Sequence, residues 1–193
     1  MRKLALDDIK DLREYERERD EFRRDIVAMK KRRRVQLGEL LTITFENTET
    51  MRFQIQEMAR IERMLTDEQI QQEVETYNQL IPAPNELSGT LFVEIDNKER
   101  LYEWLPKLVG VQRAVSIWLH DGSSVSSVPE DEERLTREDT TTTVHYVKFR
   151  LSPAQVDAFA AGPVSIVVDH PKYSAVVELT EDQRSELLGD LRD

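Results

Sequence analysis

The stretch TFENTETMRFQIQEMARIER, residues 44–63, contains the point where a strand pattern changes into a helical one. Its first residues continue a run rich in β-branched and aromatic side chains, in which Leu41, Ile43 and Phe45 alternate with polar residues. In its second half, apolar residues recur every three or four positions, which is the spacing of one helix face. The stretch therefore predicts a strand or hairpin over residues 35–46 that leads into a helix.

The predicted helix carries polar groups on the face that should meet the core. At about 100° per residue, this face collects Met51, Ile55, Met58, Ile61 and Leu65. Glu62 falls near the middle of the face and Gln54 lies inside its edge. Because a buried carboxylate needs a partner or a proton, Glu62 is either a structural residue paired with an arginine or, with Glu57 and Gln54, a candidate general base or ligand. An arginine from residues 30–34 is one such partner.

Residues 1–34 predict a single long helix that forms an N-terminal arm. Asp7 and Asp8 open it and the run KKRRR, residues 30–34, closes it, which is the order that the helix dipole favours. This segment holds 13 basic and 9 acidic residues, a net charge of +4, whereas the remainder of the chain has a net charge of −15. Its narrow apolar stripe predicts packing against the body of the protein or against a second copy.

The rest of the chain predicts helices and short strands. Residues 50–80 predict a helical pair, whose second helix begins at a TDEQ capping box and stops at two prolines. Residues 86–193 predict the sheet-rich part, interrupted by a polar, acidic loop over residues 121–139. We expect strands over residues 87–95, 114–120, 142–151 and 164–179, and helices over residues 98–110, 152–162 and 180–191. The pattern indicates one α+β domain over residues 1–193, with a mostly antiparallel mixed sheet packed with helices.

The composition bounds the classes of function. With 193 residues, of which 39% are hydrophobic, the chain is long enough for a sizeable core. Its formal charge of −11 argues against general binding of a nucleic-acid backbone, which draws affinity from Lys and Arg at the phosphates. The absence of cysteine excludes disulfides, thiol nucleophiles and iron–sulfur ligation. The charged N-terminus and the lack of a long apolar run predict a soluble, cytoplasmic protein without membrane contact.

Motifs of common enzyme mechanisms are absent from the chain. It has no Gly-rich phosphate loop and no G-x-S-x-G elbow. Its predicted helices contain no histidine, which excludes H-E-x-x-H and the Glu-x-x-His pairs of carboxylate di-iron bundles. We therefore expect no cofactor and favour a protein that is not an enzyme.

Two basic or histidine-bearing features remain as candidate sites. Arg32, Arg33 and Arg34 present planar forks that suit phosphate or carboxylate groups, and the alternative is that they satisfy the helix dipole and the acidic surface of the chain itself. The histidines could form a metal site with Asp121 or Asp169, although we expect none and interpret them as sheet residues bonded to neighbours. These histidines are His120, His145 and His170.

The segment DHPKY, residues 169–173, has two interpretations. Asp169, His170 and Tyr173 could gather around one turn as an acid/base or polar cluster, joined by His145. Alternatively, the segment is only the turn between two strands, since Asp and Pro favour turns.

The motifs KKRRRVQLG, TFENTET, QIQEMARIER, YNQLIPAPNELSGTL, VHYVKF and DHPKY occur in this order along nearly the whole chain. The series resembles a bacterial family known as unknown-function domain family 3501. The resemblance implies no assigned activity, but members of that family are often encoded beside a rubrerythrin and a cluster-binding iron–sulfur protein. It therefore implies a link to peroxide or iron–sulfur redox metabolism. A chain without Cys and Glu-x-x-His is not itself the redox carrier.

Three hypotheses of function follow. The favoured one is a non-catalytic accessory or interaction protein, a homo-oligomer whose long N-terminal helix docks on a second copy or on a redox protein. The alternative is a small-ligand-binding protein or enzyme that uses Glu57 and Glu62 with the arginines of residues 32–34. The third is weak nucleic-acid binding through the same arginines, which requires an affinity that falls steeply with salt.

Overall fold

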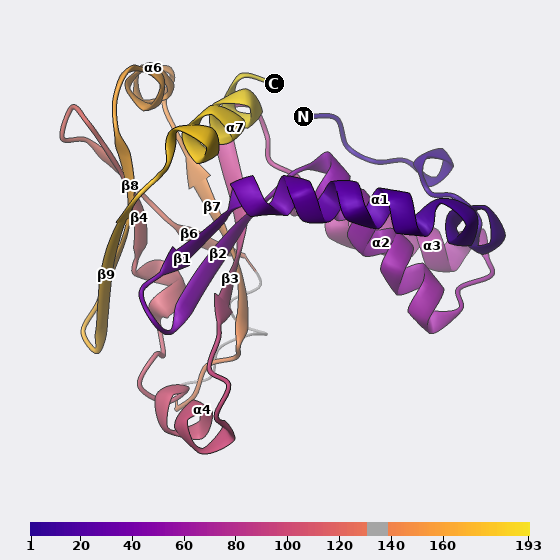
Figure 1. The fold of residues 1–193 in the computed structure, drawn as a ribbon, viewed down its shortest axis with the longest axis horizontal. Helices are drawn as coiled ribbons and strands as arrows, with labels where there is room; N and C mark the ends of the chain where they lie inside the picture. Colours follow the sequence, from indigo (N-terminus) through magenta and orange to yellow (C-terminus); the bar gives the residue numbers. More distant parts are fainter. Residues whose placement is uncertain (131–138) are drawn as a thin grey trace.

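The computed structural model describes residues 1–130 and 139–193, in which two β-sheets form a body and three helices project from it as an arm (Figure 1). The helices are α1 (Leu12–Arg33), α2 (Thr48–Glu62), α3 (Asp67–Asn78), α4 (Lys98–Trp104), α6 (Pro153–Ala161) and α7 (Glu181–Arg192), with short 3-10 turns η1 (Leu6–Asp8) and η2 (Val111–Arg113). The strands are β1 (Arg34–Leu37), β2 (Leu41–Glu46), β3 (Glu86–Val93), β4 (Val115–Leu119), β5 (Ser124–Ser126), β6 (Val128–Glu130), β7 (Val144–Arg150), β8 (Val164–His170) and β9 (Tyr173–Glu178).

The body confirms the predicted α+β class and divides the strands between two sheets. The larger sheet has the order β1-β2-β3-β7-β6 and the smaller one β5-β4-β8-β9, and every described pairing is antiparallel. The two sheets share one apolar core, to which α7 adds Leu187 and Leu191. In Figure 1, α7 and α4 lie at opposite ends of the body.

The predicted hairpin over residues 35–46 is present as β1 and β2. Val35 pairs with Ile43 and Leu37 with Leu41, so that these apolar side chains enter the core together. Gly38 in the connecting turn has φ +71°, a conformation that glycine adopts without strain. Because α1 passes into β1 without a loop, the hairpin fixes the direction in which the arm leaves the body.

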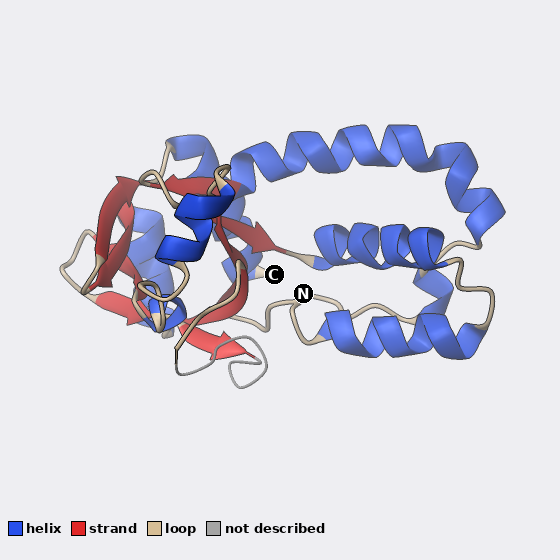
Figure 2. Cartoon of the chain, turned by 90° about the horizontal axis from the view of Figure 1, so that it is seen from below, coloured by secondary structure: helices blue, strands red, loops and turns tan. Residues whose placement is uncertain are grey.

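The arm consists of α1, α2 and α3 and has a small apolar core of its own. Met51 and Ile55 from α2 pack with Val74 of α3, and Leu4 and Ile81 join them from the flanking segments. Figure 2 shows the arm helices on one side of the molecule and both sheets on the other. Across residues 1–130 and 139–193, we find no helix whose length and apolarity would let it cross a membrane.

Three predicted boundaries are wrong. The helix predicted over residues 98–110 ends at Trp104, because the chain continues from there as turns. The long helix does not open at Asp7 and Asp8; it begins at Leu12, because Asp11 accepts the first amides as N-cap and Asp8 instead accepts a hydrogen bond from the Ala5 amide in η1. The predicted loop over residues 121–139 contains β5 and β6, and in β5 Val125 is buried in the core between the exposed Ser124 and Ser126. Residues 131–138 of that predicted loop lie outside the described residues.

Candidate functional site

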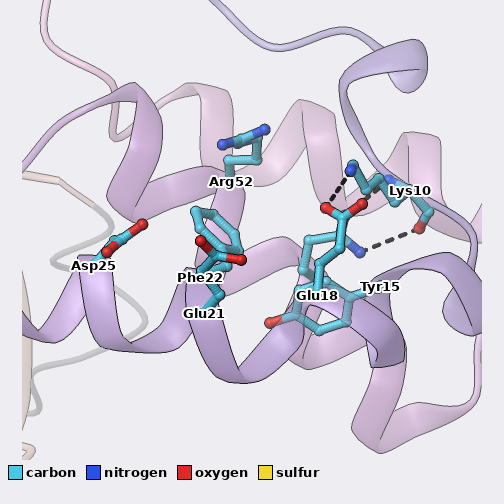
Figure 3. A pocket seen from close by; sticks show the side chains of 8 residues that line it. Lys10, Tyr15, Glu18, Glu21, Phe22, Asp25 and Arg52 are labelled. Atoms are coloured by element: carbon cyan, nitrogen blue, oxygen red, sulfur yellow. Dashed lines mark hydrogen bonds and ion pairs between the residues drawn. The ribbon is translucent and has the colours of Figure 1, made fainter.

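A cleft of about 210 Å³ lies between α1 and α2 on the arm (Figure 3). Most of its lining comes from one flank of α1, where residues spaced three or four apart face the same way. The cleft is lined by Lys10, Tyr15, Glu18, Glu21, Phe22, Asp25, Arg52 and Gln56. It therefore combines three carboxylates with two cations and two aromatic rings.

Gln56 holds the segment before α1 against α2 at one end of the cleft. Its side chain is 2% exposed; Oε1 accepts a hydrogen bond from the Lys10 amide at 2.7 Å, and Nε2 donates to the Lys10 carbonyl at 3.2 Å. The Lys10 ammonium in turn contacts Glu18 and lies 3.3 Å from a Glu14 oxygen. A buried amide with both ends bonded to one backbone unit fixes the position of that unit.

Arg52 forms the opposite side of the cleft. Its guanidinium carbon lies 4.6 Å above the centroid of the Phe22 ring, and Nη2 donates to a Glu49 oxygen at 2.5 Å. The stacking adds a cation–π contact to the ion pair. Arg52 Nε is buried and has no hydrogen-bond partner among the described residues. The Nε–H group of Arg52 is therefore available to donate a hydrogen bond to another molecule.

Glu57 sits behind the cleft at the centre of an ionic network between α1 and α2. Its Oε1 accepts from the Tyr15 hydroxyl and from Arg19 Nε, both at 2.7 Å, and its Oε2 accepts from Arg19 Nη2 at 3.0 Å. The hydrogen bonds from Arg19, and then those from Tyr15, lower the pKa of Glu57 to about 2 in spite of its burial. Burial, followed by the bond to Glu57, raises the pKa of Tyr15.

These bonds decide what the cleft can do chemically. A carboxylate with a pKa near 2 is a weak base at neutral pH, and a tyrosine whose pKa is raised stays protonated. Glu18 is bound to Lys10, whereas Glu21 and Asp25 make no ion pair among the described residues. The cleft is therefore suited to holding a charged group by ionic contact, and neither Glu57 nor Tyr15 is suited to proton transfer at neutral pH.

Glu62 and Gln54 do not face the core as predicted. Glu62 is exposed, and the neighbouring Ile61 and Leu65 are 64% and 81% exposed. α2 ends at Glu62, where Arg63 adopts a left-handed conformation with φ 53°. The buried face of the helix is centred on Met51, Ile55 and Ala59, and Ile61 lies outside it. Gln54 is half-buried and hydrogen-bonds to Tyr77.

Arg32, Arg33 and Arg34 all bind carboxylates of this chain. Arg32 Nε lies 2.9 Å from a Glu186 oxygen, and Arg34 Nη2 lies 2.6 Å from a Glu94 oxygen. Arg33 is 1% exposed and pairs with two acidic residues of α7, as described below. The geometry agrees with the alternative in which the run satisfies the acidic surface of the chain itself.

The four residues of the predicted acid/base cluster are divided between the two sheets. His145 lies in β7 and is 1% exposed; its Nε2 is 3.0 Å from Thr141 Oγ1. Asp169 is exposed, and His170 Nε2 is 2.9 Å from the Val109 carbonyl. The segment DHPKY forms the tight connection from β8 to β9. His145 is therefore not brought together with the other three residues.

The hydroxyl of Tyr173 forms hydrogen bonds with the β1–β2 hairpin. It donates to the Leu37 carbonyl at 2.6 Å and accepts from the Leu40 amide at 3.1 Å, so that it bridges the turn of the hairpin. A Cβ on Gly38 would lie 2.3 Å from this oxygen, which leaves glycine as the residue that fits. Tyr173 therefore joins the edge of one sheet to the hairpin of the other.

We expect Tyr173→Phe to lower the free energy of unfolding by about 1–2 kcal/mol, because it leaves a buried carbonyl and amide without their partner. Urea unfolding measures the difference. Tyr102→Phe is the matched control, since Tyr102 is 64% exposed and its loss should change stability by less than about 0.5 kcal/mol. Equal effects of the two substitutions would contradict the structural role of the Tyr173 hydroxyl.

Among the described residues, we find no cluster of three or more His, Asp or Glu side chains that could hold a metal ion. The His120 side chain contacts the backbone of α6, where its Nδ1 lies 2.9 Å from the Ala158 carbonyl oxygen.

The sequence reasoning missed a row of unpaired cations on the solvent face of α1. None of these side chains forms an ion pair with a described carboxylate, whereas Arg19, Arg32 and Arg33 of the same helix all do. The row consists of Arg13, Arg17, Arg23, Arg24, Lys30 and Lys31. The only indication of this row in the sequence is the net charge of +4 for residues 1–34, because the sequence does not show which cations form ion pairs.

Comparison with known proteins places the chain among its relatives. The model of the family described as "Protein of unknown function (DUF3501)" matches residues 3–191. The chain belongs to this family. A crystal structure of a novel protein of unknown function from Burkholderia pseudomallei K96243 is similar to it, with a TM-score of 0.91 and 32% sequence identity over 98% of this chain and 100% of that one. A comparison with curated proteins found no match. Family membership thus agrees with the resemblance seen in the motifs and assigns no activity.

Proposed function

We propose that this DUF3501 protein is a non-catalytic accessory protein that docks on its partners through the helical arm. The observation that carries the proposal is the row of unpaired cations on α1 in a chain whose formal charge is −11. Cations that lack partners within their own acidic protein favour contact with a carboxylate-rich surface of another molecule.

The state of the candidate catalytic groups supports this proposal over an enzyme. Glu57 is bound by Tyr15 and Arg19, and the Tyr173 hydroxyl is bound by backbone groups. His145 lies in the larger sheet and Asp169 in the smaller one. A reaction that uses them would first have to break structural bonds.

The class of partner that we propose is a redox protein of peroxide or iron–sulfur metabolism. This part rests on the resemblance to the family, whose members are often encoded beside a rubrerythrin and a cluster-binding iron–sulfur protein. The chain contains no cysteine, so in such a complex the partner would carry the cluster.

The cleft between α1 and α2 favours a second candidate function, the binding of a small charged ligand. Arg52 Nε and the carboxylates of Glu21 and Asp25 are the groups that such a ligand would contact. Under this alternative, Glu21→Gln with Asp25→Asn would abolish ligand binding and leave stability nearly unchanged.

Binding of the purified rubrerythrin and iron–sulfur protein of the same organism tests the proposed function. We expect Arg17→Glu to weaken binding of at least one of them about fivefold or more at low salt, with a smaller effect at high salt. Lys172→Glu makes the same charge change at an exposed position on the body and should leave binding unchanged. No binding by the unmodified chain, or equal losses in both variants, would contradict docking through the arm.

A further inference from the structure

The tip of the arm carries a groove of about 400 Å³ with an apolar floor and an acidic rim. Its apolar lining residues are Leu6, Ile9, Leu12, Met64, Leu65 and Ile70. Its rim holds three carboxylates, those of Asp7, Asp11 and Asp67, against one guanidinium, that of Arg13, a net charge of −2. An occupant that suits this groove is apolar and positively charged.

A second groove, of about 480 Å³, lies along the C-terminal half of α1 and has the opposite charge. Val27 and Ala28 form its floor. Its charged lining residues are three cations, Arg23, Arg24 and Lys31, and one carboxylate, Asp20. Together they carry a net charge of +2. An occupant that suits this groove is apolar and negatively charged, which is the character of the arm tip itself.

The apolar side chains beside and within these grooves are unusually open to solvent. Leu65 and Ile61 at the tip are 81% and 64% exposed, and Val27 is 49% exposed. Ala28 is small, so the floor beside Val27 has room for a larger side chain. Covering these side chains is favourable because it removes apolar surface from water.

Cations that line the two grooves share one side of α1, although the apolar residues Leu12 and Val27 are about 60° apart around the helix. At about 100° per residue, Arg13 at the tip and Arg24 and Lys31 beside the second groove lie within about 20° of one another around α1. Leu12 and Val27 are separated by about 22 Å along the helix at about 1.5 Å per residue. A two-fold axis across α1, midway between them, would place each groove of one copy opposite the other groove of a second copy.

The geometry points to the arm as a self-complementary docking surface that a second copy of this chain occupies, with the two α1 helices antiparallel and each acidic tip on the basic groove of the other copy. This inference rests on the proposed function, since it names one partner of the arm. An acidic peptide would fill only the groove on α1, and a basic peptide only the groove at the tip. In a dimer, each copy fills both grooves of the other copy. No groove stays open, so the assembly closes at two copies.

Analytical ultracentrifugation of the full chain over a range of protein concentrations tests the inference. We expect a monomer–dimer equilibrium that weakens as salt rises. Arg24→Glu and Asp7→Lys should each raise the dissociation constant about tenfold or more, because each places like charges in contact. Lys172→Glu, the same kind of charge change on the body, should leave the dimer unchanged.

Mixing the two variants makes the test specific for this pairing. In a mixed dimer, Glu at position 24 of one chain meets Lys at position 7 of the other, and the second contact keeps the original Arg24 and Asp7. We therefore expect the mixture to recover the affinity that each variant loses alone. A chain that stays monomeric at all concentrations, a dimer that tolerates both substitutions, or a mixture that fails to recover would each overturn the inference.

Asp7→Lys also separates this inference from the proposed function, because it leaves every cation of α1 in place. If the unmodified chain forms no dimer at any concentration while Asp7→Lys still binds a redox partner, the inference is wrong and the proposed function stands. If the dimer forms as expected and no redox partner binds the unmodified chain, the inference stands and the redox part of the proposed function is wrong.

Discussion

Replacing Arg33 with alanine is expected to lower the free energy of unfolding by about 3–5 kcal/mol, the range measured when one partner of a buried ion pair is removed. Arg33 is 1% exposed and contacts both carboxylate oxygens of Asp190, while Nη1 lies 3.1 Å from a Glu186 oxygen. Its Nε also donates to the Phe45 carbonyl at 3.0 Å. The substitution leaves a buried carboxylate and a buried carbonyl without partners.

Arg32→Ala is the matched control for this prediction. Arg32 binds the same Glu186 but is 48% exposed, so its loss should cost at most about 1 kcal/mol. Urea unfolding of both variants, followed by circular dichroism, gives the comparison. Similar losses in the two variants would show that Arg33 does not join α1 to α7 in the way the structure indicates.

Glu57→Gln is expected to lower the free energy of unfolding by about 1–3 kcal/mol at pH 7. The amide can still accept from Tyr15, but it loses the paired, charge-assisted bonds to Arg19. The loss should depend on pH. The pKa of Glu57 is about 2 in the folded protein against an ordinary value of 4.5, so its stabilising effect is complete above 4.5 and disappears as the pH falls towards 2.

The difference in stability between the unmodified chain and Glu57→Gln should therefore shrink as the pH is lowered from 6 to 3. Urea unfolding at several pH values measures it. Glu62→Gln is the control from the same helix, since an exposed carboxylate should contribute less than about 0.5 kcal/mol at any of these pH values. A difference for Glu57→Gln that does not change with pH would contradict the low pKa.

Most helix ends and strand positions could be predicted because their causes are local. The capping box predicted at Thr66 joins residues three positions apart and is present, and the helices predicted to start at Ser152 and Thr180 have these residues as their N-caps. The hairpin of β1 and β2 follows from alternation within a dozen residues. The start of α1 was misjudged because Asp7, Asp8 and Asp11 all resemble caps, and only the hydrogen bonds distinguish them.

The candidate site was predictable only in part. Glu57 stood out because a carboxylate lies beside the apolar face of its helix, but its partners Tyr15 and Arg19 are 42 and 38 positions away. Glu62 had the same signal and turned out to be exposed, since the periodic pattern does not say where a neighbouring helix stops covering it. Asp190, the partner of Arg33, is 157 positions away, and no spacing rule connects them.

The sequence by itself determined the α+β class, the positions of most elements and the absence of thiol and iron–sulfur chemistry, because these depend on residue type and on neighbours within one or two turns. Only the tertiary structure decided that the strands form two sheets, that Arg32 and Arg33 at the end of α1 pair with α7, and that Arg34 pairs with Glu94. It also decided that the cations along the solvent face of α1 form no ion pair with a described carboxylate. The physical reason is that an ion pair needs two groups within about 4 Å, and the chain path sets that distance.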